Sequence, residues 1–208
     1  MTPDEDAAGP AKGPSFVRVA RRHQLVESAI ETIAELGFEK ASTVVIAQRA
    51  GVSRGVLTYH FRDRDELIEQ VVQTVYDIGL REVHPPVLAA QDPRAALLAF
   101  AGSSVDFYVA YPRHVAALRE IFDAGRHTNA PTRPSTAGHA AEMTTFHETL
   151  RAGQSANQFR DFDVELMASF IRAALDVAAA HLRQGRPAEV VRTELLRTLD
   201  AATRKEDT

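Results

Sequence analysis

The sequence predicts an all-α protein. Apolar residues recur at helical spacing along most of the chain, as Val26, Ala29, Ile30 and Ile33 do near its start. No segment shows the sustained two-residue alternation, rich in β-branched side chains, that would indicate a strand. Proline and glycine breaks and capping residues divide the chain into helical segments. We expect a first helix at about 17–36, a pair of short helices within 42–61, and a helix that runs from 63 towards Pro85-Pro86. Further helices are expected at 93–111, 112–124, 138–152, 162–184 and 188–203, with a loop at 125–138.

Residues 42–61 indicate two short helices joined by a tight turn. Ser42 stands where its hydroxyl can accept an N–H group that the first turn leaves unpaired. Gly51 follows Ala50 at the place where a left-handed residue ends a helix, and Ser53 caps the next helix two residues later. Helices joined this closely cross steeply, and in that helix-turn-helix geometry the second helix enters the major groove of DNA. We therefore expect sequence-specific binding to double-stranded DNA.

Charge is distributed unevenly along the 208 residues, whose formal net charge is −4. Residues 12–64 carry nine Lys and Arg against five Asp and Glu, whereas residues 65–208 carry fifteen against twenty. A basic segment on an acidic body is typical of a DNA-binding domain joined to a part that does not touch DNA. We expect a disordered tail at 1–15, the helix-turn-helix domain at 16–64 and a ligand-binding and dimerisation domain at 65–208. Without cysteine, signal peptide or membrane span, we expect the chain to be cytoplasmic.

The N-terminal pattern resembles that of the tetracycline-repressor (TetR) family of bacterial transcriptional regulators. The resemblance covers roughly residues 18–70. Apolar, glycine, serine and aromatic residues fall at the family's spacings at Gly37-Phe38, Ile46-Ala47, Ala50-Gly51-Val52-Ser53, Gly55, Leu57, Tyr59-His60-Phe61 and Glu66-Leu67. Val56, Thr58 and Arg62-Asp63-Arg64 depart from the residues common in the family. These departures concern the base preference and not the fold.

The candidate DNA-contacting residues lie in and beside the second short helix. Arg54 follows the Ser53 cap, and an arginine there can bond guanine O6 and N7; a phosphate contact or a solvated side chain is the alternative. The resemblance implies phosphate contacts for Tyr59, His60 and Arg64, and Arg18, Arg21 and Arg22 are further basic candidates. For Val56 and His60 the alternative is a packed position, and Leu57 and Phe61 are assigned to the core. The full set is Ser42, Ser53, Arg54, Gly55, Val56, Thr58, Tyr59, His60 and Arg64.

The helices expected at 162–184 and 188–203 carry more apolar surface than one buried stripe needs. Small alanines in the first of them permit close helix approach. A homodimer interface built from helix pairs is the simplest use of this surface, and the family resemblance implies the same. Packing within one chain is the alternative, and some of these residues must serve it.

A cavity in the C-terminal domain is the second expectation drawn from the resemblance. Aromatic and thioether side chains are the candidate lining, although each of them alone is better explained by core packing: Phe100, Phe107, Tyr108, Phe122, Phe146, Met167 and Phe170. Polar candidates nearby are Ser103, Ser104, His114 and His147. The sequence indicates no cluster of arginines there, so we expect a neutral or weakly charged hydrophobic effector.

These observations predict a regulator, most simply a repressor released from a palindromic operator by a small hydrophobic effector. The alternative is a helix-turn-helix protein that responds to a protein partner or to no ligand. An enzyme is disfavoured: His147-Glu148 begins a zinc-binding motif but lacks its second histidine, and no phosphate-cradling glycine loop is present. We expect no cofactor, no metal and no membrane partner.

Overall fold

The computed structural model describes residues 16–127 and 137–205, all in helices and their connections apart from one isolated bridge between Phe159 and Arg204. The predicted all-α class is confirmed in this part of the chain. The helices are α1 (Phe16–Leu36), α2 (Thr43–Arg49), α3 (Arg54–His60), α4 (Arg64–Leu88), α5 (Pro93–Ala110), α6 (Pro112–His127), α7 (Ala137–Ser155), α8 (Val164–Arg183) and α9 (Ala188–Thr203). The tail expected at 1–15 lies outside the described residues, as does most of the expected loop, at 128–136.

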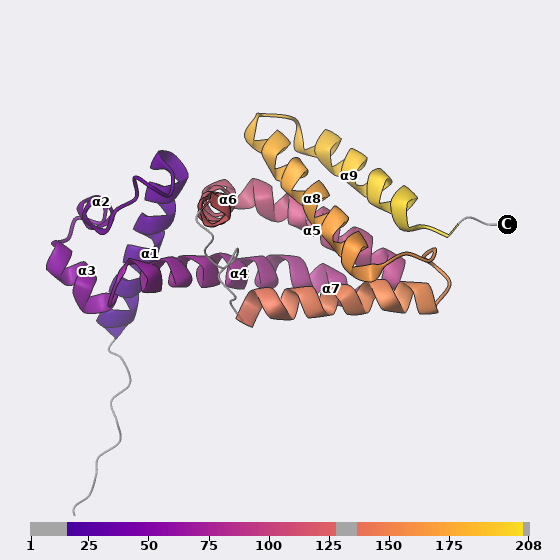
Figure 1. Ribbon diagram of the computed structural model, residues 1–208, viewed down its shortest axis with the longest axis horizontal. Coiled ribbons are helices and arrows are strands. Elements are labelled where there is room, and N and C mark those ends of the chain that lie inside the picture. Colours follow the sequence, from indigo (N-terminus) through magenta and orange to yellow (C-terminus); the bar gives the residue numbers. More distant parts are fainter. Residues whose placement is uncertain (1–15, 128–136, 206–208) are drawn as a thin grey trace, which may run out of the picture.

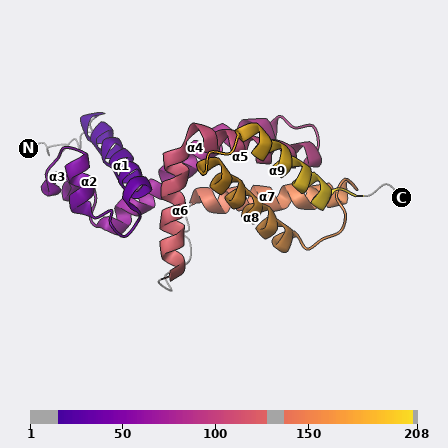
Figure 2. The same cartoon turned by 90° about the horizontal axis from the view of Figure 1, so that it is seen from above.

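The molecule is elongated, with α1–α3 gathered at one end and α5 and α7–α9 at the other (Figure 1). The long helix α4 begins beside α3 and extends into the larger body. Seen from above, α6 runs across the long axis between the two ends (Figure 2). Two helices, α4 and α6, therefore connect the helix-turn-helix end to the rest of the chain. None of the helices in the described residues is both long and apolar enough to span a membrane.

Helix α4 continues past Pro85 and Pro86 to Leu88, three residues beyond the break that the sequence suggests. Both prolines are exposed, and so are Arg81 and Glu82, four residues before them. The carbonyl groups that lose their helical N–H partner thus belong to exposed residues and can be hydrated, which lowers the cost of proline inside a helix.

Two apolar clusters form the core. The first joins α1–α4 to α5 and α6, and its fully buried residues include Leu25, Phe61 and Leu67. The second joins α5 and α7–α9 around residues such as Leu150 and Ile171. Because α4 packs into the same cluster as α1–α3, the expected domain boundary at residue 64 does not coincide with a gap in packing.

The turn after α7 shows how the second cluster is closed. Phe159 is 2% exposed, and its ring occupies the space next to Gly153 that a β-carbon would fill. Across the same end of the body, Arg94 donates two hydrogen bonds to the Asp200 carboxylate, at 2.6 and 2.8 Å. These hydrogen bonds lower the pKa of Asp200 and hold α9 against the start of α5.

We predict opposite effects of alanine at two helical glycines. Gly153→Ala places a methyl group into the Phe159 ring and should lower the free energy of unfolding by about 1–3 kcal/mol. Gly79→Ala, where a β-carbon would lie 3.8 Å from Phe107, should leave stability unchanged or raise it by up to about 1 kcal/mol. Urea denaturation followed by circular dichroism measures the free energy of unfolding of both variants. Equal losses of stability would contradict the placement of the Phe159 ring beside Gly153.

Candidate DNA-binding surface and internal cavity

The two short helices begin at the predicted serine caps. The Ser42 hydroxyl accepts the N–H of Val45, and the Ser53 hydroxyl accepts the N–H of Val56, each at 3.3 Å. Gly51 adopts the left-handed conformation, with φ of +67°, between them. An alanine at Gly51 would be strained there even though nothing crowds its position. The capping roles of both serines and the turn role of Gly51 are therefore confirmed, while their contact with DNA stays a prediction.

Helix α3 presents one face to solvent and buries the other. Arg54, Gly55, Thr58 and Tyr59 are exposed, with Tyr59 73% exposed despite its large ring. Leu57 is buried at 1% exposure and Phe61, directly after the helix, is equally buried, as predicted. Val56 is half-buried, which matches the packed alternative as well as a contact with a base. The exposed face thus carries a cation, a hydroxyl and a phenol side by side on two turns.

His60 closes α3 with a half-buried ring that meets Tyr59 edge to face, at 5.2 Å between centroids. Burial lowers the pKa of His60, and the positive charges of Arg18, Arg22 and Arg21 lower it further. The neutral imidazole is therefore favoured, and in that form His60 can offer a hydrogen bond to a phosphate but little charge.

Arg22 on α1 points into the domain. It donates to the carbonyl of His60, to Glu66 at 3.0 Å and to Gln70 at 3.3 Å. Its guanidinium carbon lies 4.1 Å from the centroid of the Phe61 ring. The sequence suggested a DNA contact for Arg22, whereas the structure shows it joining α1, the end of α3 and the start of α4.

The start of α4 is capped as the sequence predicts. Asp63 accepts the N–H of Glu66 at 2.8 Å, and the Glu66 carboxylate accepts the N–H of Arg62 at 2.8 Å. The pKa of Glu66 is lowered, first by that backbone hydrogen bond and then by Arg22. Both carboxylates are thus held in the charged form, which suits the positive end of a helix dipole.

Arg64 makes contacts other than the phosphate contact that the resemblance implies. Its guanidinium donates to the carbonyls of Phe38 at 2.6 Å and Ala41 at 3.3 Å, and it stacks on the Phe38 ring at 4.0 Å. Arg64 therefore holds the loop between α1 and α2 against α4. A phosphate contact by the same side chain stays a prediction and would have to use its remaining donors.

A cavity of about 400 Å³ lies between α4, α5, α6, α7 and α8, within the range of about 300–1,000 Å³ that is usual for small-molecule sites. One face of α4 supplies a wall, with Val75, Gly79, Val83 and Val87 spaced four residues apart. The structure brings together five of the predicted lining residues, namely Phe100, Phe107, Tyr108, Phe122 and Phe146. The α4 wall was missed, although its regular four-residue spacing is visible in the sequence.

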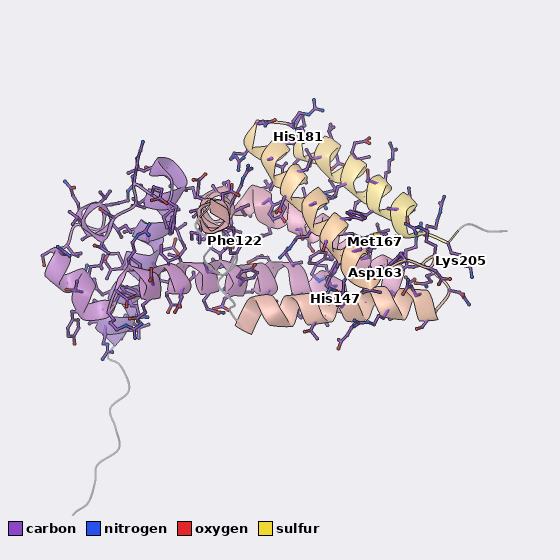
Figure 3. All side chains as sticks on the ribbon, in the orientation of Figure 1. Phe122, His147, Asp163, Met167, His181 and Lys205 are labelled. Carbon is purple, nitrogen blue, oxygen red and sulfur yellow. The ribbon has the colours of Figure 1, made fainter. Side chains whose placement is uncertain are left out.

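Two predicted lining residues do not border the cavity. Met167 is 6% exposed and packs in the second core cluster, on the opposite side of α8 from the cavity. Phe170 is 59% exposed on the outer surface of α8. Figure 3 shows Met167 well along the body from Phe122, which lies on α6. Composition could not reveal these positions, because all faces of α8 carry apolar residues.

The polar lining also differs from the expectation. Ser104 borders the cavity, but Ser103 donates to the carbonyl of Ala99, His114 faces Glu27 at 3.4 Å, and neither they nor His147 are part of the lining. The polar and charged groups that do border it come from five helices: His84, Ser104, Arg119, Thr145, Thr149, Arg172, Asp176 and Arg183. The expectation of a lining without clustered arginines is therefore wrong.

A capped helix-turn-helix with an exposed second helix, attached to a helical body with a cavity, defines a class of DNA-binding regulators. The family model of bacterial regulatory proteins, tetR family, matches residues 25–71. The HTH-type transcriptional regulator BetI of Yersinia pestis (strain Pestoides F) is 38% identical over 88 residues. BetI of Pectobacterium carotovorum is 49% identical over 43 residues. Residues 25–71 of the chain therefore match the TetR family of bacterial regulatory proteins, and both relatives are transcriptional regulators.

The matches to these relatives are partial. The Yersinia alignment covers 41% of this chain and 44% of the relative, so the chain spans less than half the length of the curated relative it matches. The Pectobacterium alignment covers 21% of this chain and 22% of the relative. The family model thus matches the N-terminal part of the chain, and the comparison of the C-terminal body rests on solved structures.

Solved structures resemble the whole fold. A TetR-family regulator from Rhodococcus sp. superposes with a TM-score of 0.77 at 21% identity, covering 88% of this chain and 98% of that one. The ketosteroid regulator KstR2 of Mycobacterium tuberculosis gives 0.71 at 24%, covering 89% and 96%. A regulator from Saccharomonospora viridis in complex with choline gives 0.68 at 19%, covering 90% and 100%. At these identities the likeness concerns the fold alone.

The contacts of Arg64 predict a role in stability. Arg64→Ala removes two hydrogen bonds and the stacking on Phe38, and should lower the free energy of unfolding by about 1–3 kcal/mol. Arg62→Ala is the matched control, because its side chain is 80% exposed and its ion pair with Asp63 should contribute less than about 1 kcal/mol. Chemical denaturation compares the two variants. Equal stabilities would show that Arg64 does not hold the loop.

Proposed function

We propose that the protein binds an inverted-repeat operator as a homodimer and leaves it when a small, largely apolar effector fills the cavity. The observation that carries this proposal is that one helix, α4, has its start beside the DNA-facing helix and its C-terminal half in the cavity wall. Arg22 fastens the end of α3 to that start through His60 and Glu66. A change at the cavity therefore has a direct mechanical route to α3.

The exposed face of α3 supports the DNA-binding part of the proposal. The Arg54 side chain extends from the first residue of the helix and makes no hydrogen bond or ion pair with the described residues. Recognition helices contact base edges with the side chains at their N-terminal end, and arginine is the residue that most often reads guanine. Thr58 and Tyr59, one turn later, lie on the same exposed side and suit contacts with the DNA backbone.

An exposed apolar stripe on α8 supports the homodimer. Leu166, Phe170 and Val177 are 54, 59 and 57% exposed, and with Ala173 they recur at the spacing of one helical face. Val190 at the start of α9 adds a further exposed side chain, at 47%. A contiguous apolar stripe of this kind is costly in water and suits a self-complementary interface. Two-fold symmetry would then place two copies of α3 towards two half-sites of an inverted repeat.

The cavity supports an effector over the alternative of a protein partner. A space of about 400 Å³ with aromatic walls is a poor use of a core unless something occupies it. An effector shifts the equilibrium only if it binds the DNA-free arrangement more tightly than the DNA-bound one. Filling the space beside Val83 and Val87 would displace the C-terminal half of α4, and a helix of 25 residues carries that tilt to α3.

We predict that Arg54→Ala weakens operator binding by about 1–3 kcal/mol and relaxes the preference at one base pair in each half-site. Stability should not change, because the side chain is exposed. Operators selected from random duplexes, followed by titration with fluorescent DNA at several salt concentrations, measure both effects. Arg81→Ala on α4, whose side chain is 65% exposed, is the control and should match the wild type. If Arg54→Ala weakened binding to all DNA sequences equally, the Arg54 side chain would contact a phosphate and not a base.

We predict that Phe170→Glu converts the dimer to monomers. The charge would face its own copy across the two-fold axis in an apolar setting, while the isolated subunit keeps its fold because Phe170 is not in the core. Analytical ultracentrifugation and DNA titration should show a smaller species with weaker operator binding. Val109→Glu, at a residue 53% exposed on α5, is the matched control. If the Phe170→Glu variant remained dimeric, the dimer interface would have to lie on another part of the surface.

A further inference from the structure

Three arginines border the cavity. Arg119 extends from α6, and Arg172 and Arg183 extend from α8. Asp176 is the one carboxylate among the described lining residues, and His84 is the one imidazole. Arginine stays charged at every physiological pH, so the lining carries a permanent excess of positive charge. Nothing in the proposed regulation by an apolar effector accounts for this charge.

The arginines on α8 share one helical face. Residues 172, 176, 179 and 183 recur at the spacing of one side of a helix. This side adjoins the stripe of exposed apolar residues around Phe170, because Val177 belongs to the stripe and also borders the cavity. Arg172 is half-buried, whereas Arg183 is exposed at the end of the helix, and Thr145 and Thr149 of α7 border the same cavity. In both overall views this end of α8 approaches α6, which carries Arg119 (Figures 1 and 2).

Most of the remaining lining is apolar. The α4 face and the rings of Phe100, Phe107 and Phe146 provide it. Arg119 is already paired with Asp123 at 3.3 Å, but a half-exposed pair of this kind is weak and exchanges readily with another anion. The cavity therefore combines a largely apolar lining with a cationic margin formed by the three arginines, which is the arrangement that an anionic amphiphile requires.

We propose that the effector is an amphiphile with an apolar chain and a carboxylate, whose chain lies against α4 and whose carboxylate is bound by the cavity arginines, Arg172 above all. This inference rests on the proposed function and names the chemical class of its effector. Arginine binds carboxylates through paired, charge-assisted hydrogen bonds, and these are stronger where water is partly excluded, as at a half-buried side chain.

A cationic effector fits this lining less well. Aromatic rings can bind a quaternary ammonium group, and the cavity has several rings. The same group would, however, meet three guanidinium groups and a single aspartate. Like charges across a partly desolvated site disfavour binding, so the positive lining selects against cationic head groups. A neutral head group gains no electrostatic attraction from the lining.

The test compares three probes with the same chain and different head groups: decanoate, decan-1-ol and decyltrimethylammonium, each below its micelle concentration. Native mass spectrometry and calorimetry of the full chain measure their affinities. We expect decanoate to bind about tenfold or more tightly than either other probe, a difference of about 1.4 kcal/mol. Equal affinity of the alcohol, tighter binding of the ammonium probe, or no binding of decanoate would overturn the inference.

Variants locate the carboxylate. Arg172→Gln should remove at least about tenfold of the preference for decanoate over decanol, and Arg172→Lys should restore part of it. The double variant Arg119→Gln with Arg183→Gln should lower the preference further. Arg151→Gln, an exposed arginine on α7 outside the lining, is the matched control and should bind like the wild type. An unchanged preference in all of the cavity variants would refute the assignment of these arginines.

The failure of this inference and that of the proposed function can be told apart. Operator binding without any probe tests the DNA-binding function and does not involve the cavity. Release of operator by decanoate but equally by decanol would retain the proposed effector site and reject its preference for an anion. The melting temperature of each unliganded variant shows whether Arg172→Gln still folds, and the lysine variant supplies an independent measurement if it does not.

Discussion

The arrangement of the DNA-facing end depends on the guanidinium of Arg22. From α1 it reaches the last carbonyl of α3, two side chains of α4 and the face of the Phe61 ring. A planar group with several donors can join three elements in this way, whereas a lysine could not reproduce the geometry. Since the exposed reading face of α3 is only two turns long, its direction is set by these contacts and by the burial of Leu57 and Phe61.

The link between this end and the cavity uses two routes with different chemistry. The first is α4 itself, which is apolar where it packs on α1 and again where it lines the cavity. The second is the contact of α6 with α1, where His114 faces Glu27 at 3.4 Å and Arg113 faces Glu31 at 3.5 Å. The apolar packing of α4 is rigid, while the exposed Arg113–Glu31 ion pair can rearrange at little cost. Helix α6 is also held by apolar packing, because Ala117 and Ile121 are buried in the same cluster as α1 and α4.

Local signals in the sequence predicted the helix-turn-helix well. The caps at Ser42, Ser53 and Asp63 and the left-handed Gly51 depend on neighbours within a few residues, so their roles follow from the sequence alone. The helical class follows from spacing in the same manner. The inward contacts of Arg22 and Arg64 could not be predicted, because their partners lie 23 to 48 residues away in the chain.

The cavity shows the same limit more clearly. Five of its aromatic residues were predicted because large rings are rare and concentrate in α5–α7, but Met167 and Phe170 were misplaced because the rotation of α8 is a tertiary property. The charged margin joins Arg119 to Arg172 and Arg183, more than fifty residues further on. None of these arginines has a local pattern that distinguishes it from a solvated one. Chain folding alone brings these arginines to one cavity, and the positive charge that they share there is the basis for the proposed anionic effector.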